Sequence, residues 1–273
     1  MEIGFSSYSG GDFLWFFGFL IAAAVVAGFW IPGALRPEGR LSQVNDAEKL
    51  AYLAGGRTRF GESVLANLFA RGDLRTRKKT IIKSTHPQPE TEAERAVLRV
   101  PGDFRWSDAR KALDAHARDI DRDLAARGLL IAPDERLKFR LLPVLPYAVL
   151  LVIGTFRLQA GAAQGEPVGY LTLMLIAVTV LGFVRLAKFN PRTQAGDEAL
   201  AEAQDHSSRL RSAPTRAETG MAVGLFGTAV LVGTPFESLH AMRQQGGGGY
   251  ADGGGDGDGG GGCGGGGCGG CGG

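Results

Sequence analysis

The fold is decided first by residues 13–35, FLWFFGFLIAAAVVAGFWIPGAL, which contain no charged side chain over 23 consecutive positions. A helix rises about 1.5 Å per residue, so this stretch would be roughly 34 Å long, enough to cross a hydrocarbon core of about 30 Å. A cleaved signal peptide would need a basic segment in front, whereas residues 1–12 carry Glu2 and Asp12 without Lys or Arg. We therefore predict a retained membrane span over 13–35.

Two more apolar runs follow a charged middle region. Residues 141–156 read LLPVLPYAVLLVIGTF and residues 168–184 read VGYLTLMLIAVTVLGFV, and an arginine closes each run. Both are slightly short for a bilayer, but the short connection between them would join them as a tight antiparallel hairpin. A helical hairpin in a soluble core is the alternative. We predict transmembrane helices over 141–157 and 168–185.

A fourth uncharged run, residues 219–236 (TGMAVGLFGTAVLVGTPF), is less hydrophobic and contains four glycines. Gly220 and Gly224 have the small-xxx-small spacing that lets membrane helices approach closely. We treat this run as a candidate fourth span, with a buried or interfacial helix of similar length as the alternative. If the run spans, the glycine-rich end of the chain lies outside; otherwise that end stays in the cytoplasm.

Basic residues are distributed unevenly along the chain, and this asymmetry predicts its orientation. Residues 1–12 hold no Lys or Arg, and the connection between the second and third spans holds Arg157 alone, whereas 36–140 hold 22 basic and 16 acidic residues. Five more basic residues lie in 186–218. We therefore predict a multi-pass protein of the cell membrane, with 36–140 and a helical segment over 186–218 in the cytoplasm. The short N-terminus over 1–12 would lie outside.

The region 36–140 is long enough for a compact domain and contains several helix signals. Capping residues would begin its helices and glycines would end them. One predicted helix opens at Asn45-x-x-Glu48 and stops at Gly55-Gly56, and a second runs from about Thr58 to Arg71 before Gly72. A third opens at Thr91-x-x-Glu94, and a fourth runs from Asp108, capped by Ser107, to Arg127 before Gly128.

An internal echo indicates a repeated unit in this domain. Residues 68–74 and 124–130 share the pattern L-x-A-R-G-x-L. Each copy is followed by a stretch suited to a short hairpin, over 74–83 and over 129–140. Helices, a glycine stop and a hairpin outline a winged-helix unit. The predicted fold class is an α-helical membrane protein with three or four transmembrane helices, a mainly helical α+β cytoplasmic domain of tandem winged-helix type, and a disordered tail.

A basic run on the first predicted hairpin would present positive charge to a phosphate. The surplus over 36–140 is only six charges, and no aromatic side chain interrupts the run. A solvated face or contact with anionic lipid headgroups therefore explains it better than nucleic-acid contact. The run comprises Arg71 and the candidate contact residues Arg75, Arg77, Lys78, Lys79 and Lys83.

A cluster of acidic residues on the fourth predicted helix is interleaved with arginines at ion-pairing spacings. This pattern favours a charged exposed face over a metal site. The cluster comprises Asp114, His116, Asp119, Asp121 and Asp123. The sequence contains no phosphate loop, dinucleotide fingerprint or nucleophile elbow, so we assign no catalytic residue and an enzyme is the less favoured interpretation.

Residues 246–273 form a tail with 20 glycines in 28 positions, and it holds all three cysteines of the chain. Cys263, Cys268 and Cys271 have C-x4-C-x2-C spacing, and three thiolates could hold a soft metal such as zinc or copper with a fourth ligand from elsewhere. Polyglycine is costly to order and supplies no supporting hydrogen bonds. A disordered or disulfide-crosslinking tail is therefore favoured, with a metal site as the alternative.

Several short motifs occur together in a fixed order. They are AYLAGG (51–56), ARG (70–72), ERAV (94–97), ARGL (126–129), AVGLFG (222–227) and the final GGCGGGGCGGCGG. From about residue 10 onward the chain resembles an uncharacterised family of bacterial membrane proteins that end in a Gly/Cys-rich low-complexity tail. The resemblance implies a membrane location and carries no catalytic residue.

The sequence thus favours a non-enzymatic, membrane-anchored interaction or scaffold protein. Its expected partners are the lipid bilayer and proteins that contact 36–140 or the tail. The alternative is a metal-binding, thiol-redox or crosslinking membrane protein that acts through the tail cysteines. A membrane-tethered DNA-binding regulator ranks last.

Overall fold

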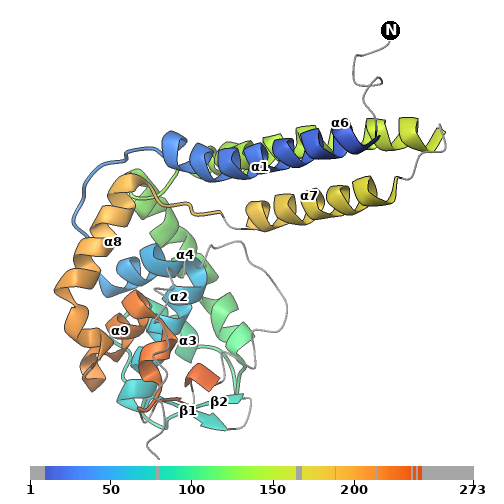
Figure 1. Cartoon of the computed structure of the whole chain (residues 1–273). Helices are drawn as coiled ribbons and strands as arrows, with labels where there is room; N and C mark the ends of the chain where they lie inside the picture. The colour runs from blue at the N-terminus through green and yellow to red at the C-terminus, as the bar shows by residue number, and fades with distance from the viewer. Residues whose placement is uncertain are drawn as a thin grey trace, which may run out of the picture.

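The computed structural model describes residues 10–77, 80–163, 168–187, 189–212, 214–234, 236–237 and 239–241. It is mostly helical and has two parts, a bundle of three long helices and a globular domain (Figure 1). The bundle consists of α1 (Gly10–Leu35), α6 (Leu145–Ala163) and α7 (Gly169–Ala187). The globular domain lies at the end where α1 ends, α6 begins and α7 ends, so it is assembled from two segments of the chain, one before α6 and one after α7.

The bundle helices are apolar on their inner and outer sides alike, as membrane-spanning helices are. Phe17 is fully buried between the helices, and Gly154 permits a close approach because a Cβ there would lie 2.5 Å from Leu175 Cδ2. On the outside, Trp15 is 85% and Phe19 is 72% exposed. The described residues contain three helices long and apolar enough to cross a membrane, over Phe13–Ile31, Arg136–Ala163 and Gly169–Ala187. These features make the chain a helical membrane protein.

The second apolar helical stretch, Arg136–Ala163, extends beyond the prediction of 141–157 at both ends. A short helix, α5 (Arg136–Leu141), and a 3₁₀ turn, η1 (Leu142–Val144), precede α6. Proline is tolerated in the first turn of a helix, which accounts for Pro146 near the start of α6. The helix continues past Arg157, which is 8% exposed and lies 5.4 Å from the ring centroid of Phe13. Arg157 is therefore packed inside the bundle and does not end the helix.

The globular domain is built around α2 (Ala47–Arg71). This helix contacts four others, α3 (Glu92–Leu98), α4 (Trp106–Ala126), α8 (Gln194–His206) and α9 (Thr219–Phe226). Three turns complete the second segment, η2 (Ser208–Arg211), η3 (Arg216–Glu218) and η4 (Thr228–Leu231). The core side chains come from both segments of the chain, and the largest fully buried ones include Phe60, Leu65, Leu68, Phe104, Leu124 and Leu231.

A two-stranded antiparallel sheet confirms the first predicted hairpin. β1 (Leu74–Arg77) pairs with β2 (Thr80–Lys83), with Leu74 opposite Lys83 and Arg77 opposite Thr80. An isolated bridge joins Ile81 to Phe104 and ties the sheet to the segment before α4. The second predicted hairpin, over 129–140, is wrong: α5 occupies its second half, and Leu130 forms a bridge with Arg192 instead. The tandem winged-helix hypothesis therefore lacks its second hairpin.

The candidate fourth span over 219–236 is a buried part of the globular domain. α9 has only eight residues and ends at Gly227, whose φ of 89° lies in the left-handed region. The predicted close approach of its two glycines does occur, but against α2. The backbone amide of Gly220 donates to an α2 side chain 3.0 Å away, and a Cβ on Gly224 would lie 2.8 Å from Ala51 Cβ. The run is thus a core helix rather than a membrane helix.

The echoed pattern L-x-A-R-G-x-L marks the same kind of helix end twice. The glycines, Gly72 and Gly128, have φ angles of 83° and 77°. In each copy the amide after the glycine donates to the carbonyl of the leucine five positions earlier, at 2.9 Å for Leu68 and 3.0 Å for Leu124. This is the Schellman motif, which satisfies carbonyl groups left over at a helix C-terminus. The echo therefore reflects a shared helix stop.

The predicted helix starts are partly confirmed. The capping box of Thr91 and Glu94 is present at the start of α3. For α2 the cap is Asp46 rather than Asn45, because the Asp46 side chain accepts the amide of Glu48. α4 begins after Arg105 rather than at the predicted Ser107 cap.

Candidate anion-binding pocket

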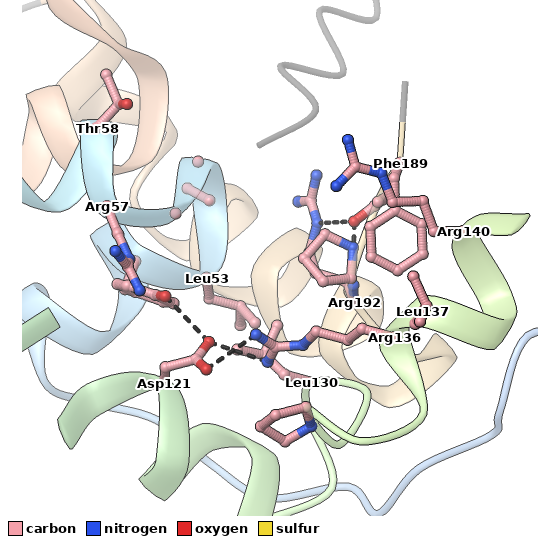
Figure 2. A pocket seen from close by; sticks show the side chains of 17 residues that line it. Leu53, Arg57, Thr58, Asp121, Leu130, Arg136, Leu137, Arg140, Phe189 and Arg192 are labelled. Atoms are coloured by element: carbon pink, nitrogen blue, oxygen red, sulfur yellow. Dashed lines mark hydrogen bonds and ion pairs between the residues drawn. The ribbon is translucent and has the colours of Figure 1, made fainter. Parts of the chain in front are cut away.

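A pocket of about 470 Å³ lies where α2 is kinked (Figure 2). The helix stop predicted at Gly55-Gly56 is confirmed as a break within α2, since Gly55 has φ −160° and ψ 31° and Gly56 has φ 62° and ψ −152°. The backbone angles of Gly56 are accessible essentially to glycine alone. The helix resumes at Arg57, and this turn lines the pocket together with α5 and residues 189–192. The two glycines thus shape the wall of the pocket.

Positive charge dominates the polar walls. Arg57 comes from α2, Arg136 and Arg140 come from α5, and Arg192 comes from the segment before α8. Asp121 of α4 is the one carboxylate among the described residues that line the pocket. The five side chains therefore carry a net charge of about three positive units at neutral pH.

Asp121 is held by two neighbours. Arg136 donates from both Nη groups to the two carboxylate oxygens, at 2.9 Å each, and from Nε to the carbonyl of Ile131. The hydroxyl of Tyr52 donates to Oδ1 of Asp121 at 3.0 Å (Figure 2). Burial, together with the charge and hydrogen bond of Asp121, raises the pKa of Tyr52 to about 12. This charge-assisted network is a rigid wall, because a bidentate pair fixes both side chains.

Arg192 is the most enclosed of the other three arginines, with 13% of its side chain exposed. Its Nε donates to Oδ1 of Asn190 at 3.1 Å and lies 3.3 Å from Asp197, a carboxylate that also pairs with Arg36. Burial lowers the pKa of Arg192, the charge of Asp197 opposes this change, and that of Arg36 adds to it. One carboxylate therefore serves two arginines, and a positive charge is left over beside the pocket.

The remaining two arginines are more lightly held. Arg57 lies 4.0 Å from Asp114 and also interacts with the hydroxyl of Tyr52, and 47% of its side chain is exposed. Arg140 donates from Nε to the carbonyl of Leu186, the residue before the last of α7, at 3.2 Å. Both side chains can therefore turn toward a ligand without breaking a short ion pair.

The basic run predicted as a contact surface is divided in the structure. Arg75 and Arg77 are exposed on β1, whereas Lys83 donates to a backbone carbonyl and lies 5.8 Å from the ring centroid of Phe104. Lys78 and Lys79 lie outside the described residues. The hairpin is at the end of the domain away from the bundle, so its position lends no support to contact with the membrane that holds the helices (Figure 1).

Arg71, the first residue of the predicted basic run, has a structural role. Its guanidinium lies 3.2 Å from Asp73, 3.0 Å from Glu90 and 2.5 Å from the buried Glu94. These three carboxylates tie the end of α2 to the start of α3.

Two acidic residues of α4 make the ion pairs that their spacing predicted, whereas the side chain of Asp114 lies near Arg57 of α2 instead. Arg122 pairs with Asp119 at 2.5 Å, and Arg127 pairs with Asp123 at 3.0 Å. Asp121 also departs from the predicted pairing, because it points into the domain and forms part of the pocket wall. Among the described residues, no group of three or more His, Cys, Asp or Glu could hold a metal ion. The tail cysteines Cys263, Cys268 and Cys271 lie outside the described residues.

The pocket could not be predicted from the sequence, because its residues are widely separated in the chain. Arg57, Asp121, Arg136 and Arg192 carry no shared motif, and only the Gly55-Gly56 pair was a visible signal. Comparison with protein families, with characterised proteins and with solved structures finds no match to this chain. The arrangement of the pocket must therefore carry any functional conclusion, and the resemblance to a bacterial membrane-protein family stays a prediction.

Proposed function

We propose that the protein is a non-enzymatic, membrane-anchored binding protein whose arginine-lined pocket holds an anionic group, such as the phosphate or carboxylate of a small ligand or of a partner protein. The observation that carries this proposal is the charge of the pocket. Four arginines line about 470 Å³, and the one described carboxylate on its walls is already bound by Arg136 and Tyr52.

An anion would complete the pocket electrostatically. Positive charge that is partly withdrawn from water is costly unless it is paired. The planar arginine fork matches phosphate and carboxylate, and a hydrogen bond to a charged group contributes about 1.5–3 kcal/mol. Arg57, Arg140 and Arg192 surround the space from three different segments, so one ligand could contact all three.

The chemistry of the walls supports binding rather than catalysis. The described residues that line the pocket include no histidine, cysteine, serine, lysine or glutamate. Asp121 is held by Arg136 and Tyr52, so it is poorly placed to act as a general base. An interaction or scaffold role fits these walls better than a reaction does.

The distribution of charge at the helix ends supports a cytoplasmic domain. Arg36, Arg136, Lys138, Arg140 and Arg185 all lie close to the domain-side ends of the three helices. At the other end, the sequence before Phe13 has no Lys or Arg. Basic residues next to spans favour the cytoplasmic side, so we place the pocket in the cytoplasm and the start of α1 outside.

The test is thermal unfolding of the purified full-length protein in neutral detergent, titrated with inorganic pyrophosphate at constant ionic strength. We expect a saturable rise in Tm, because a ligand that binds only the folded state stabilises it. Arg57→Gln should weaken the effect, and Arg77→Gln, on the exposed hairpin, should not. A rise that never saturates, or one that is equal in R57Q and R77Q, would contradict the proposal.

A further inference from the structure

A second, smaller pocket lies directly among the ends of the three bundle helices. Its volume is about 250 Å³. Gly33 belongs to the last turn of α1, Pro143 to the turn before α6, and Arg185 to the last turn of α7, and all three line it. The apolar part of each helix ends at this level. The pocket therefore lies where a bilayer would change from hydrocarbon to headgroups.

Arginines supply the charge of this pocket as well. Arg36, Arg140 and Arg185 line it, and none of its described lining residues is acidic. Arg36 is paired with Asp197. Arg140 and Arg185 form no ion pair with a carboxylate in the described part of the chain. The pocket is therefore left with two uncompensated positive charges at the membrane boundary.

Arg185 does not simply extend into water. An arginine at the end of a membrane helix usually reaches outward, so that its charged group is solvated. Here Nε of Arg185 is buried and has no hydrogen-bond partner among the described residues. The guanidinium packs 5.3 Å from the ring centroid of Phe29 on α1. A buried donor without a partner is costly, and an acceptor in the pocket would remove that cost.

Apolar side chains surround the same level of the molecule. Leu141 and Leu142 are 51% and 40% exposed just before α6, and Trp30 near the end of α1 is 73% exposed. In a bilayer these side chains would face lipid, so lipid molecules would lie next to the arginines of the pocket. An amphipathic ligand would satisfy both groups of side chains, with its charged group in the pocket and its chains along the bundle.

We propose that this pocket binds the phosphate group of an anionic phospholipid from the leaflet next to the globular domain. Arg140 and Arg185 would donate to the phosphate oxygens, and the acyl chains would lie against the bundle. Basic pockets between the ends of membrane helices bind anionic headgroups by this combination. The site adjoins the larger pocket, with which it shares Arg140, Phe189 and Asn190, but it does not depend on the function proposed for that pocket.

The test uses full-length protein stripped of lipid and reconstituted in nanodiscs of phosphatidylcholine, with or without phosphatidylglycerol. Native mass spectrometry counts the lipids retained on release, and thermal unfolding reports stability. We expect retained phosphatidylglycerol and a higher Tm in the mixed nanodiscs. Arg185→Gln and Arg140→Gln should each weaken retention about fivefold, the loss expected for one basic residue facing anionic lipid.

The controls separate this site from its alternatives. Arg57 lines only the larger pocket, so R57Q should retain phosphatidylglycerol fully. If R57Q loses the lipid and R185Q keeps it, the assignment is overturned. Equal retention of the two lipids by the wild type overturns it too, as does equal stabilisation by inorganic phosphate in phosphatidylcholine alone. If circular dichroism shows that R185Q is unfolded, R140Q decides the result.

Discussion

The bundle and the globular domain bury apolar residues in different ways. In the bundle, Phe17 is buried while Trp15 and Phe19 face outward, so apolar side chains cover both sides of the helix. In the domain, α4 is two-faced: Leu113 and Leu124 are buried, whereas the opposite face carries ion pairs. The contrast reflects the two surroundings, lipid for one and water for the other.

α9 combines the composition of the bundle with the position of a core helix. Like residues 13–35 of α1 it contains no charged residue, yet it is packed against α2 in the centre of the globular domain. Length distinguishes the two cases, because Gly227 ends α9 after eight residues. A span needs about 20 residues, so hydropathy without an unbroken helix is not enough.

The largest expected effect tests whether α9 stays on the domain side. With three spans, the tail cysteines should lie on the same side as the domain, which we place in the cytoplasm. A membrane-impermeant thiol reagent should leave intact cells unlabelled and label the protein only after lysis. In a variant with all three cysteines replaced by serine, Ser7→Cys should give the opposite pattern. Labelling of the wild type in intact cells would contradict this topology.

The next largest effect is a difference between a phenylalanine in the domain core and one on the outside of the bundle. Phe60 in the domain core is fully buried, so Phe60→Ala should lower the free energy of unfolding by about 3–5 kcal/mol. Phe19 on the bundle faces outward. Phe19→Ala should change the free energy of unfolding little, because that side chain contacts lipid before and after the helices separate. Denaturation of both variants in micelles measures the difference. Equal losses would mean that the bundle exterior is packed against protein.

A smaller effect is expected from glycines. Gly224→Leu should destabilise the domain by about 1–3 kcal/mol, because the new side chain would overlap Ala51. Gly18 on α1 has no atom within 4 Å of its Cβ position, so Gly18→Leu is the matched control. The Tm of the two variants gives the comparison. A tolerated G224L would indicate that α9 is loosely packed on α2.

The smallest effect concerns pH and the polar contacts of the domain. The pKa of Tyr52 is raised to about 12, so the folded state holds this proton more tightly than the unfolded state does. The stability that this tighter proton binding adds to the folded state is fully present below pH 10 and is lost as the pH rises toward 12. Tyr52→Phe should remove this part of the pH dependence, as measured by denaturant unfolding from pH 9 to 12. An unchanged pH profile in Y52F would show that Tyr52 is not the source of this pH dependence.

Local signals predicted much of the fold. Apolar runs located the three long helices, and the glycine stops at Gly72 and Gly128 were correct because a helix end is determined by neighbouring residues. The predictions of a second hairpin and a fourth span were wrong for the opposite reason. Leu130 pairs with Arg192 and α9 packs on α2, and both contacts join segments that are far apart in the chain. The pocket was missed on the same grounds, since its arginines converge only after the domain is assembled.

The division of the globular domain between two chain segments also sets the order of its synthesis. α2 ends at Arg71, but its main packing partner α9 begins at Thr219, after two membrane helices. At about 5–20 residues per second, the ribosome needs roughly 7–30 s to make the chain between them. During that interval the side of α2 that α9 will cover has no partner. The nascent chain thus depends on timely insertion of α6 and α7, and a delay there would extend the exposure of an unfinished core to chaperones and proteases.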